Sequence, residues 1–377
     1  MDYRQPFHLT PNRVWRTYPG GMLLDRIEGK ESPADSHLPE DWVGSATRAL
    51  NPGDRPPHEG IGTAAGADRR EVAIDALFGA APEQVLGPEH VAEFGADPQL
   101  LVKLLDSSAR LHIQAHPTED WAKRHLGARN GKTEAWWVLE ARVETPSVLL
   151  GFQRPPEPRE WRRIIASQDL DAMLACFDPI PVSPGDVLLV KGGVPHAVGA
   201  GLLMVEVQEP TDYVVRCEYG RGGYDLPESA CTMGLGIDRV LDLFDYTAYP
   251  AATVKDVFGP KSRTVAESPG GREEMLLGPP QTDRFEVRQV AVEGSLSLPL
   301  DGRFSIVIVL EGEGEIVGDG LALPVSTWSR VLLPAALGSV TVEGRLKAAR
   351  CLPPLAKRRT TSHLPLGAYM PRKDLHT

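Results

Sequence analysis

Short apolar runs alternate with segments that contain glycine and proline along most of the chain. Five such runs occupy residues 147–150, 187–190, 202–207, 304–310 and 330–333. Many short runs separated by turn residues are typical of β-sandwiches and β-barrels. The run at 304–310 is rich in β-branched residues and apolar on both of its faces, so the sequence predicts a buried strand there.

Fewer segments show the three- and four-residue apolar spacing of an amphipathic helix. They cover residues 70–79, 117–126, 158–177 and 238–246. In the second of these, Thr118 is followed by Glu119 and Asp120, which gives a capping hydroxyl and an acidic first turn. We therefore expect a mainly β protein in which a few helices decorate the sheets.

The length of 377 residues predicts two hydrophobic cores, because a single core stops growing at roughly 250–300 residues. Residues 51–69 are rich in Gly, Pro and charge and are interpreted as a surface loop. Residues 259–283 have a similar composition and are the best candidate connection to a C-terminal β-domain. The tail after Pro354 is expected to be a surface strand or coil. The segment 185–190 is echoed in pattern by 329–334, which indicates two related β units.

Charge and cysteine content narrow the classes of function. A net charge of −11 argues against a surface for nucleic acid or anionic membrane, although a local group of Lys and Arg could still hold an anionic substrate. None of the 4 cysteines forms a CxxC pair, so reduced thiols are expected and a thiolate zinc site is not. No leader sequence is visible and no apolar run reaches the roughly 20 residues of a membrane span, so we expect a cytoplasmic protein.

Residues 111–117 form the first of three segments with candidate metal ligands. Polar and apolar residues alternate here, so on a β-strand His112, Gln114 and His116 share one face. Three nitrogen or oxygen donors that point the same way make a plausible metal platform. Taken alone, the segment fits a solvated strand face equally well.

The other two segments each contribute one candidate ligand. Lys132 and Glu134 share a face of a predicted strand at 132–139, where a surface ion pair is the simpler interpretation. After the strand at 187–190, glycines and Pro195 make a tight turn that presents His196, and a lone histidine is usually structural. Together the segments offer two imidazoles, a carboxylate and an amide oxygen, which is a mixed nitrogen and oxygen set for a divalent ion.

These residues resemble the type I mannose-6-phosphate isomerases, a bicupin family. The resemblance spans roughly residues 10–355 and its motifs follow the family's order. The matching segments are Gln114-Ala115-His116-Pro117, Gly131-Lys132-Thr133-Glu134, Pro195-His196, the strand residue Glu206, Thr211-Asp212-Tyr213-Val214-Val215-Arg216, and Leu310-Glu311-Gly312-Glu313-Gly314, which is similar to a turn of the second cupin.

The resemblance implies a mainly β fold of two cupin barrels (double-stranded β-helices) with a few decorating helices. Residues 1–258 would form the N-terminal metal-binding cupin with helical insertions. Residues 259–377 would form a C-terminal cupin that lacks metal ligands. The oligomeric state does not follow from the sequence.

The resemblance also implies the chemistry. A divalent ion, usually zinc, would be bound by Gln114, His116, Glu134 and His196. Lys132, Glu206 and Arg216 would surround a sugar phosphate. The reaction would interconvert mannose 6-phosphate and fructose 6-phosphate through a metal-stabilised cis-enediol, with Arg216 stabilising negative charge. Glu206, Lys132 and His112 are the candidate proton carriers, and the sequence does not choose among them.

Several positions depart from the family pattern around the sugar. Val198 stands where an aromatic residue often follows Pro-His-Ala, and Thr211 replaces a serine. Arg13-Val14-Trp15 is similar to the family's Arg-x-Trp, but the Gly-Gly that usually follows directly comes later, at 20–21. No phosphate-binding motif is present, and the basic candidates for this role are Lys103, Arg129 and Arg221.

These departures leave other functions open. The chain could isomerise another or an unphosphorylated sugar. It could be a cupin that binds metal and senses sugars without turning them over, although Lys132, Glu206 and Arg216 argue for catalysis. A cupin oxygenase would usually have three histidines and one carboxylate, where this chain offers a glutamine.

Overall fold

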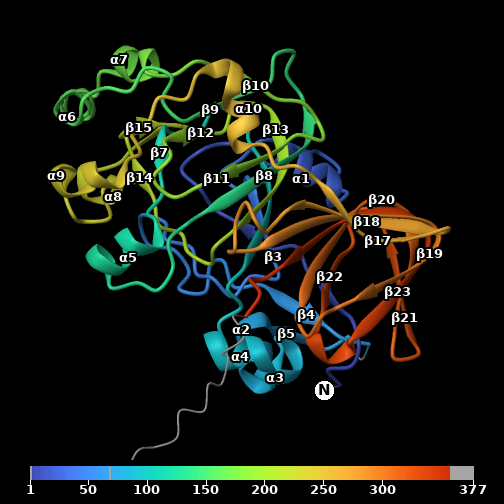
Figure 1. The fold of residues 1–377 in the computed structure, drawn as a ribbon. Helices are drawn as coiled ribbons and strands as arrows, with labels where there is room; N and C mark the ends of the chain where they lie inside the picture. The colour runs from blue at the N-terminus through green and yellow to red at the C-terminus, as the bar shows by residue number, and fades with distance from the viewer. Residues whose placement is uncertain (1, 68, 357–377) are drawn as a thin grey trace, which may run out of the picture.

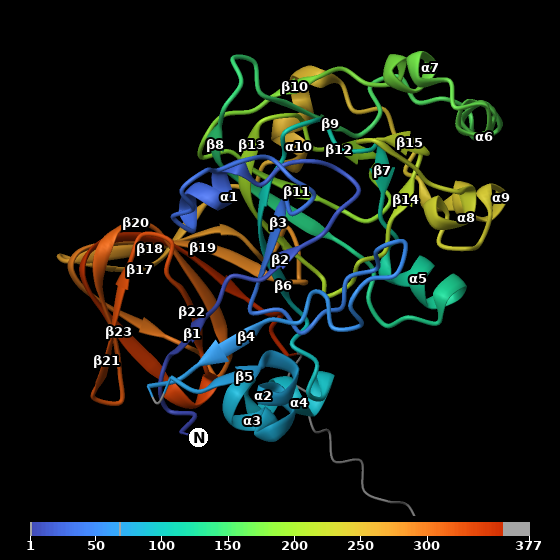
Figure 2. The same cartoon turned by 180° about the vertical axis from the view of Figure 1, so that it is seen from behind.

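The computed structural model describes residues 2–67 and 69–356, and the tail after Pro354 lies almost wholly outside this range. The chain is mainly β, as expected. Figures 1 and 2 show two regions side by side: a C-terminal group of long strands, and a larger N-terminal region where smaller sheets are flanked by helices. Among the described residues, no helix is long and apolar enough to cross a membrane.

The largest sheet has ten strands in the order β17-β18-β19-β23-β20-β22-β1-β4-β5, with β21 paired to β20. Its strands are β1 (Phe7–Leu9), β4 (Thr63–Ala65), β5 (Glu71–Ala73), β17 (Arg263–Ser268), β18 (Gly271–Leu277), β19 (Glu286–Pro299), β20 (Ser305–Gly318), β21 (Leu321–Ser326), β22 (Arg330–Leu333) and β23 (Ser339–Leu352).

Two smaller sheets and one hairpin make up the rest of the β structure. The six-stranded sheet has the order β11-β8-β13-β6-β3-β2 and contains β2 (Arg13–Val14), β3 (Glu40–Val43), β6 (Leu101–Asp106), β8 (Glu134–Ala141), β11 (Val187–Val190) and β13 (Leu202–Gln208). The five-stranded sheet has the order β10-β9-β12-β7-β14 and contains β7 (Gln114–Ala115), β9 (Ser147–Leu150), β10 (Ile180–Pro181), β12 (His196–Ala197) and β14 (Val215–Arg216). The hairpin is β15 (Gly220–Arg221) with β16 (Tyr224–Asp225).

The helices are short and lie at the edges of the sheets (Figure 1). They are α1 (Met22–Ile27), α2 (Ile74–Ala80), α3 (Pro82–Val85), α4 (Pro88–Phe94), α5 (Glu119–Leu126), α6 (Pro158–Ser167), α7 (Leu170–Ala175), α8 (Glu228–Cys231), α9 (Ile237–Val240) and α10 (Val254–Phe258), with single 3-10 turns η1 (Leu241–Leu243), η2 (Ala251–Thr253) and η3 (Ala335–Leu337). The predicted start of α5 is confirmed, because the Thr118 hydroxyl accepts a hydrogen bond from the Trp121 amide.

Several predicted elements have different bounds in the structure. The helix expected at 158–177 breaks into α6 and α7 at Gln168, which has φ 53°. The connection expected at 259–283 contains β17 and β18, so its interpretation as a linker was wrong. The turn expected at 310–314 was also wrong. Those residues continue β20 through a bulge, and a Cβ on Gly312 would lie 2.1 Å from the Arg345 carbonyl oxygen.

Strand pairing ties the first residues of the chain to its C-terminal part. β1 pairs with β22 on one side and with β4 on the other, so the ten-stranded sheet contains segments from both halves. The largest apolar cluster is likewise shared, since Phe7 and Leu9 pack in it with Phe285 and Ile306. The ten-stranded sheet therefore crosses the boundary between residues 1–258 and 259–377. The division of the chain into two domains at this boundary stays a prediction.

A buried ion pair also joins the two parts. Arg330 at the start of β22 lies 2.6 Å from Asp41 of β3, and both side chains are buried. The Asp41 carboxylate also accepts the Asn12 amide hydrogen. A charge that is removed from water in this way depends on its partner, because an uncompensated buried charge is costly.

We expect Arg330→Met to lower the free energy of unfolding by about 3–5 kcal/mol, because it leaves Asp41 buried without its cation. Urea unfolding followed by circular dichroism measures the change. The matched control is Arg345→Met. Its ion pair with Glu293 is exposed, so its loss should cost less than about 1 kcal/mol. Equal stabilities of the two variants would contradict the assignment.

Candidate metal centre

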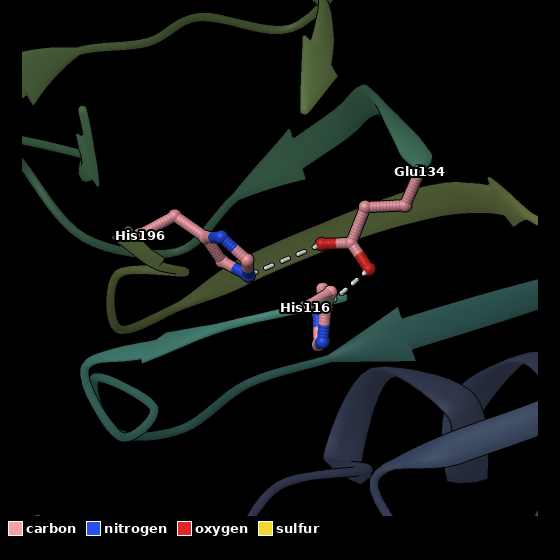
Figure 3. Close-up of side chains that lie close together, drawn as sticks. All are labelled: His116, Glu134 and His196. Atoms are coloured by element: carbon pink, nitrogen blue, oxygen red, sulfur yellow. Dashed lines mark ion pairs between the residues drawn. The ribbon is translucent and has the colours of Figure 1, made fainter. Parts of the chain in front are cut away.

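Three of the predicted metal ligands converge between the two smaller sheets. His116 directly follows β7, Glu134 begins β8 and His196 begins β12. Their candidate ligand atoms lie within 4.8 Å of one another, and all three side chains are buried. In Figure 3 the two imidazoles approach the two oxygens of one carboxylate. The Nε2 atoms of His116 and His196 lie 3.2 Å and 3.4 Å from oxygens of Glu134.

Both imidazoles are oriented by backbone carbonyls behind them. Nδ1 of His116 lies 2.8 Å from the Tyr213 carbonyl oxygen, and Nδ1 of His196 lies 2.8 Å from that of Val194. A carbonyl oxygen only accepts, so each Nδ1 carries the hydrogen and each neutral ring turns an Nε2 lone pair toward Glu134. Burial and the Lys132 ammonium lower the pKa of His116 to about 3, and burial lowers the pKa of His196.

Gln114 and Lys132 complete the immediate surroundings. Gln114 pairs with His196 across β7 and β12, and its amide nitrogen lies 3.4 Å from Nε2 of that histidine. An amide can present either its nitrogen or its oxygen there by a half-turn about its last bond. The Lys132 ammonium lies 2.9 Å from His116 Nε2 and 3.0 Å from Glu134 Oε2. All four predicted ligands therefore lie together, with Lys132 beside them.

The donor set fits a divalent cation. Burial disfavours ionisation of Glu134, but the adjacent Lys132 and His116 outweigh it and hold the pKa of this carboxyl well below its usual range. Its Oε2 accepts no hydrogen bond in the described chain, although an ammonium lies beside it. An ionised carboxylate between two neutral imidazoles is a donor arrangement that suits zinc and similar metals.

His116 and Glu134 of the cluster line a pocket that contains about 530 Å³ of empty space, counted to its open mouth. Its charged walls come mainly from the six-stranded sheet and from the segment before β3. The cationic side chains are Arg16, Lys103, Lys132 and Arg216, and the carboxylates are Glu40, Glu134, Glu206 and Asp212. His112, Gln114 and His116 all line the pocket, as the alternation predicted, although only Gln114–Ala115 is strand and Leu111 lines the pocket too.

Most of these charges neutralise one another. Arg16 holds the two oxygens of Asp212 at 2.6 Å and 2.9 Å and donates to Glu40 at 3.0 Å. Lys103 donates to Glu206 at 2.8 Å. Burial disfavours ionisation of Glu40, but Arg16 and Lys103 prevail and lower its pKa to about 2. These paired charges make a rigid polar wall, because a buried ion is stable only beside its counter-ion.

Among the four carboxyls that line the pocket, Glu206 is the one whose pKa is raised. It lies on β13 with one oxygen on Lys103. Burial and the nearby carboxylates of Glu134 and Glu40 raise its pKa, while Lys103 and Lys132 oppose them. A carboxyl that binds its proton more firmly than usual, inside a polar pocket, is suited to proton transfer.

The side chains of Arg216 and His112 have polar atoms without a hydrogen-bond partner in the described chain. Arg216 lies on β14 opposite Gln114, and its guanidinium makes no hydrogen bond or ion pair within residues 2–67 and 69–356. Burial and the neighbouring Arg16 lower its pKa, but a guanidinium starts so high that it stays charged. Nε2 of His112 is buried without a hydrogen-bond partner.

The sequence missed part of the wall. Arg13, singled out from the Arg-x-Trp motif, turns away to Asp25, Glu28 and the Leu38 carbonyl, and Arg16 lines the pocket instead. Of the basic candidates for phosphate binding, Lys103 lines the pocket, whereas Arg129 and Arg221 do not.

Arg129 binds carbonyls of α4, and Arg221 binds Glu218 and the Arg110 carbonyl. No periodic pattern marks this wall in the sequence, because Arg16, Thr17 and Tyr18 all line the pocket and lie outside a strand.

The protein is mainly β. Residues 279–353 match the family model described as the mannose-6-phosphate isomerase cupin domain. This range covers the long strands β19, β20 and β23, and it does not include the candidate metal ligands.

Matches that cover more of the chain are to proteins named mannose-6-phosphate isomerase. Mannose-6-phosphate isomerase of Streptococcus mutans is 28% identical over 278 residues, which cover 68% of this chain and 80% of the relative. ManA, the mannose-6-phosphate isomerase of Bacillus subtilis strain 168, is 26% identical over 257 residues, or 65% of this chain and 72% of the relative. A crystal structure of a Bacillus subtilis mannose 6-phosphate isomerase matches the fold with a TM-score of 0.73 at 22% identity, covering 92% of this chain and 99% of that one.

We expect His116→Ala and Glu134→Ala to lower the affinity for a divalent ion more than about 100-fold, because each removes a direct donor. Metal content after dialysis, measured by plasma mass spectrometry, gives the result. His125→Ala is the matched control, since its imidazole pairs with Asp242 outside the pocket. Retained metal in both cluster variants would show that the ion binds elsewhere.

Proposed function

We propose that the chain is a metal-dependent aldose–ketose isomerase that interconverts mannose 6-phosphate and fructose 6-phosphate. The observation that carries the proposal is a buried His-Glu-His cluster, of which His116 and Glu134 line the same pocket as the unpaired guanidinium of Arg216. The relatives named mannose-6-phosphate isomerase support the same reaction class.

The proposal includes the type I bicupin architecture and its ligand set. Two cupin barrels would correspond to residues 1–258 and 259–377, with metal ligands in the first alone. Gln114, His116, Glu134 and His196 would hold the ion, and Zn²⁺ suits their two neutral imidazoles and single carboxylate. A bound ion supplies a Lewis acid that polarises the sugar carbonyl.

The chain's own residues would manage the proton and the charge. In the reaction a proton leaves C2 of the aldose and returns at C1, while the hydroxyl proton on O2 is exchanged for one on O1, with a cis-enediol between. Glu206 is the proton carrier that its raised pKa favours, and Lys132 is the second candidate. The free donors of Arg216 would stabilise negative charge on the sugar oxygens.

One observation favours an alternative substrate. Arg16, Lys103 and Lys132 are each already paired with carboxylates, so Arg216 is the only pocket cation without a described partner. If Arg216 faces the reacting oxygens, no second unpaired cation remains in the pocket for a phosphate. An isomerase of another or unphosphorylated sugar therefore stays a candidate, as does a cupin that binds sugars without turnover.

Incubation of the metal-loaded protein in heavy water separates these possibilities. The proposed enzyme converts mannose 6-phosphate to fructose 6-phosphate and incorporates deuterium at C1 or C2. Turnover of free mannose alone would favour the unphosphorylated substrate. Binding of sugars without isotope exchange, in a protein with full metal occupancy, would indicate a sensor and would overturn the proposed reaction.

We expect Arg216→Met to lower kcat about 100- to 1,000-fold, because it removes a charge that acts on the developing enediolate. Arg216→Lys should recover part of the rate, since an ammonium restores charge without the planar donors. Steady-state kinetics with metal content checked in each sample gives the result. Arg162→Met is the control, because its ion pair with Asp238 is exposed and outside the pocket. A kcat of Arg216→Met near that of the control would exclude the role.

A further inference from the structure

His112 is a polar side chain of the pocket, and it has no role in the proposed reaction once Glu206 and Lys132 are preferred among the three candidate proton carriers. It is 2% exposed, it lines the pocket, and its Nε2 has no hydrogen-bond partner among the described residues. Of the pocket side chains, only Glu134 and His112 have such an orphaned buried atom, and Glu134 belongs to the metal cluster. An unpaired buried polar atom costs roughly 1–3 kcal/mol, so its presence calls for an explanation.

The position of His112 places it away from the reacting end of a substrate. It precedes Gln114 by two residues on the same pocket-facing side, which along extended chain corresponds to about 6–7 Å. Gln114 is flanked by His196 on one neighbouring strand and by Arg216 on the other. A hexose whose reacting carbons lie at the cluster would therefore bring later hydroxyl groups of its carbon chain to His112.

The groups around His112 leave it no protein partner of opposite charge. The pairing of the segments that contain Arg216 and Gln114 continues by one further hydrogen bond, which the Cys217 amide donates to the Ile113 carbonyl. This hydrogen bond brings Glu218 near His112. The Glu218 carboxylate is engaged by Arg110 at 2.6 Å and 3.0 Å and by the Ile113 amide at 2.7 Å. The imidazole therefore keeps an unsatisfied ring nitrogen in a residue that lines the pocket.

We propose that Nε2 of His112 hydrogen-bonds a hydroxyl of the sugar remote from C1 and C2, and so contributes to the choice of sugar. A hydroxyl both donates and accepts, so it pairs with either tautomer of the ring. The remote hydroxyl does not change during isomerisation, and the contact is equally strong in ground and transition states. Such a contact lowers KM and leaves kcat unchanged. The identity of the ligand as a sugar rests on the proposed function.

Another buried histidine of the chain provides the structural comparison. His90 on α4 is also 2% exposed and also has one unpaired ring nitrogen. Its other nitrogen bonds the Asp97 carbonyl, its ring packs on Phe94 and Phe304, and it does not line the pocket of His112. Replacement of His90 should therefore affect stability alone, which makes His90→Phe the matched control.

The test measures the affinity for two non-reacting probes, mannitol 6-phosphate and mannitol, by calorimetry, alongside KM and kcat for mannose 6-phosphate. We expect His112→Phe to raise the Kd and KM roughly 3- to 10-fold, the loss of one hydrogen bond, with kcat within about twofold. His112→Asn, which keeps a hydrogen-bonding group, should recover most of the affinity. Metal content should stay the same in all variants.

Deoxy analogues identify the hydroxyl. Mannitol 6-phosphates that lack one hydroxyl at C3, C4 or C5 should include one that wild type and His112→Phe bind equally well. Should His112→Phe fail to fold, His112→Leu replaces it, because it also removes the hydrogen bond and is smaller. Unchanged affinity for both probes in the folded variant, or a tenfold fall in kcat at constant KM, would overturn the proposal.

The design separates this proposal from the proposed function. If wild type binds mannitol 6-phosphate or mannitol without turning over any sugar, the reaction is wrong, and a weaker His112→Phe complex still supports the contact. If wild type isomerises the sugar but His112→Phe binds the probes as wild type does, the contact is wrong and the reaction stands. Absence of both binding and turnover overturns the two together.

Discussion

The ionised state of Glu134 is the condition on which the site depends. Its two oxygens face the Nε2 atoms of His116 and His196, and it is buried. A carboxyl so far from water would keep its proton if it stood alone. The ammonium of Lys132 at 3.0 Å supplies the field that keeps it ionised. The carbonyls behind the two imidazoles fix the lone pairs that complete the donor set.

Charge pairing divides the pocket into a scaffold and a face for ligands. Arg16 and Lys103 are held by carboxylates, and these ion pairs give the wall its rigidity. The side chains of Arg216 and His112 take no part in these ion pairs. Arg216 lies opposite Gln114 on the neighbouring strand, and His112 precedes Gln114 by two residues. Polar groups that the protein leaves unsatisfied are the ones a ligand can satisfy. The two side chains therefore mark the part of the pocket that faces substrate.

The sequence predicted which side chains of residues 111–117 share a face better than it predicted the long-range contacts that surround them. Alternation placed His112, Gln114 and His116 on one face, and the structure bears this out, because side-chain direction follows from local backbone geometry. The bounds of β9, β11 and β22 were also correct. Arg16 and the strand pairing of β1 with β22 were not predicted, since both depend on contacts between residues far apart in the chain. The bulge in β20 was mistaken for a turn, because Gly312 favours a positive φ in either setting.

The C-terminal strands support the pocket without lining it. The described residues contain a single group of histidine and carboxylate ligands, and it lies outside the C-terminal sheet. That sheet nevertheless reaches the pocket through β3, where Asp41 binds Arg330 on one face and Glu40 contacts Arg16 and Lys103 on the other. Successive residues of a strand point in opposite directions, so one short strand connects the two. The C-terminal strands thereby help to position a wall made of residues from the N-terminal region.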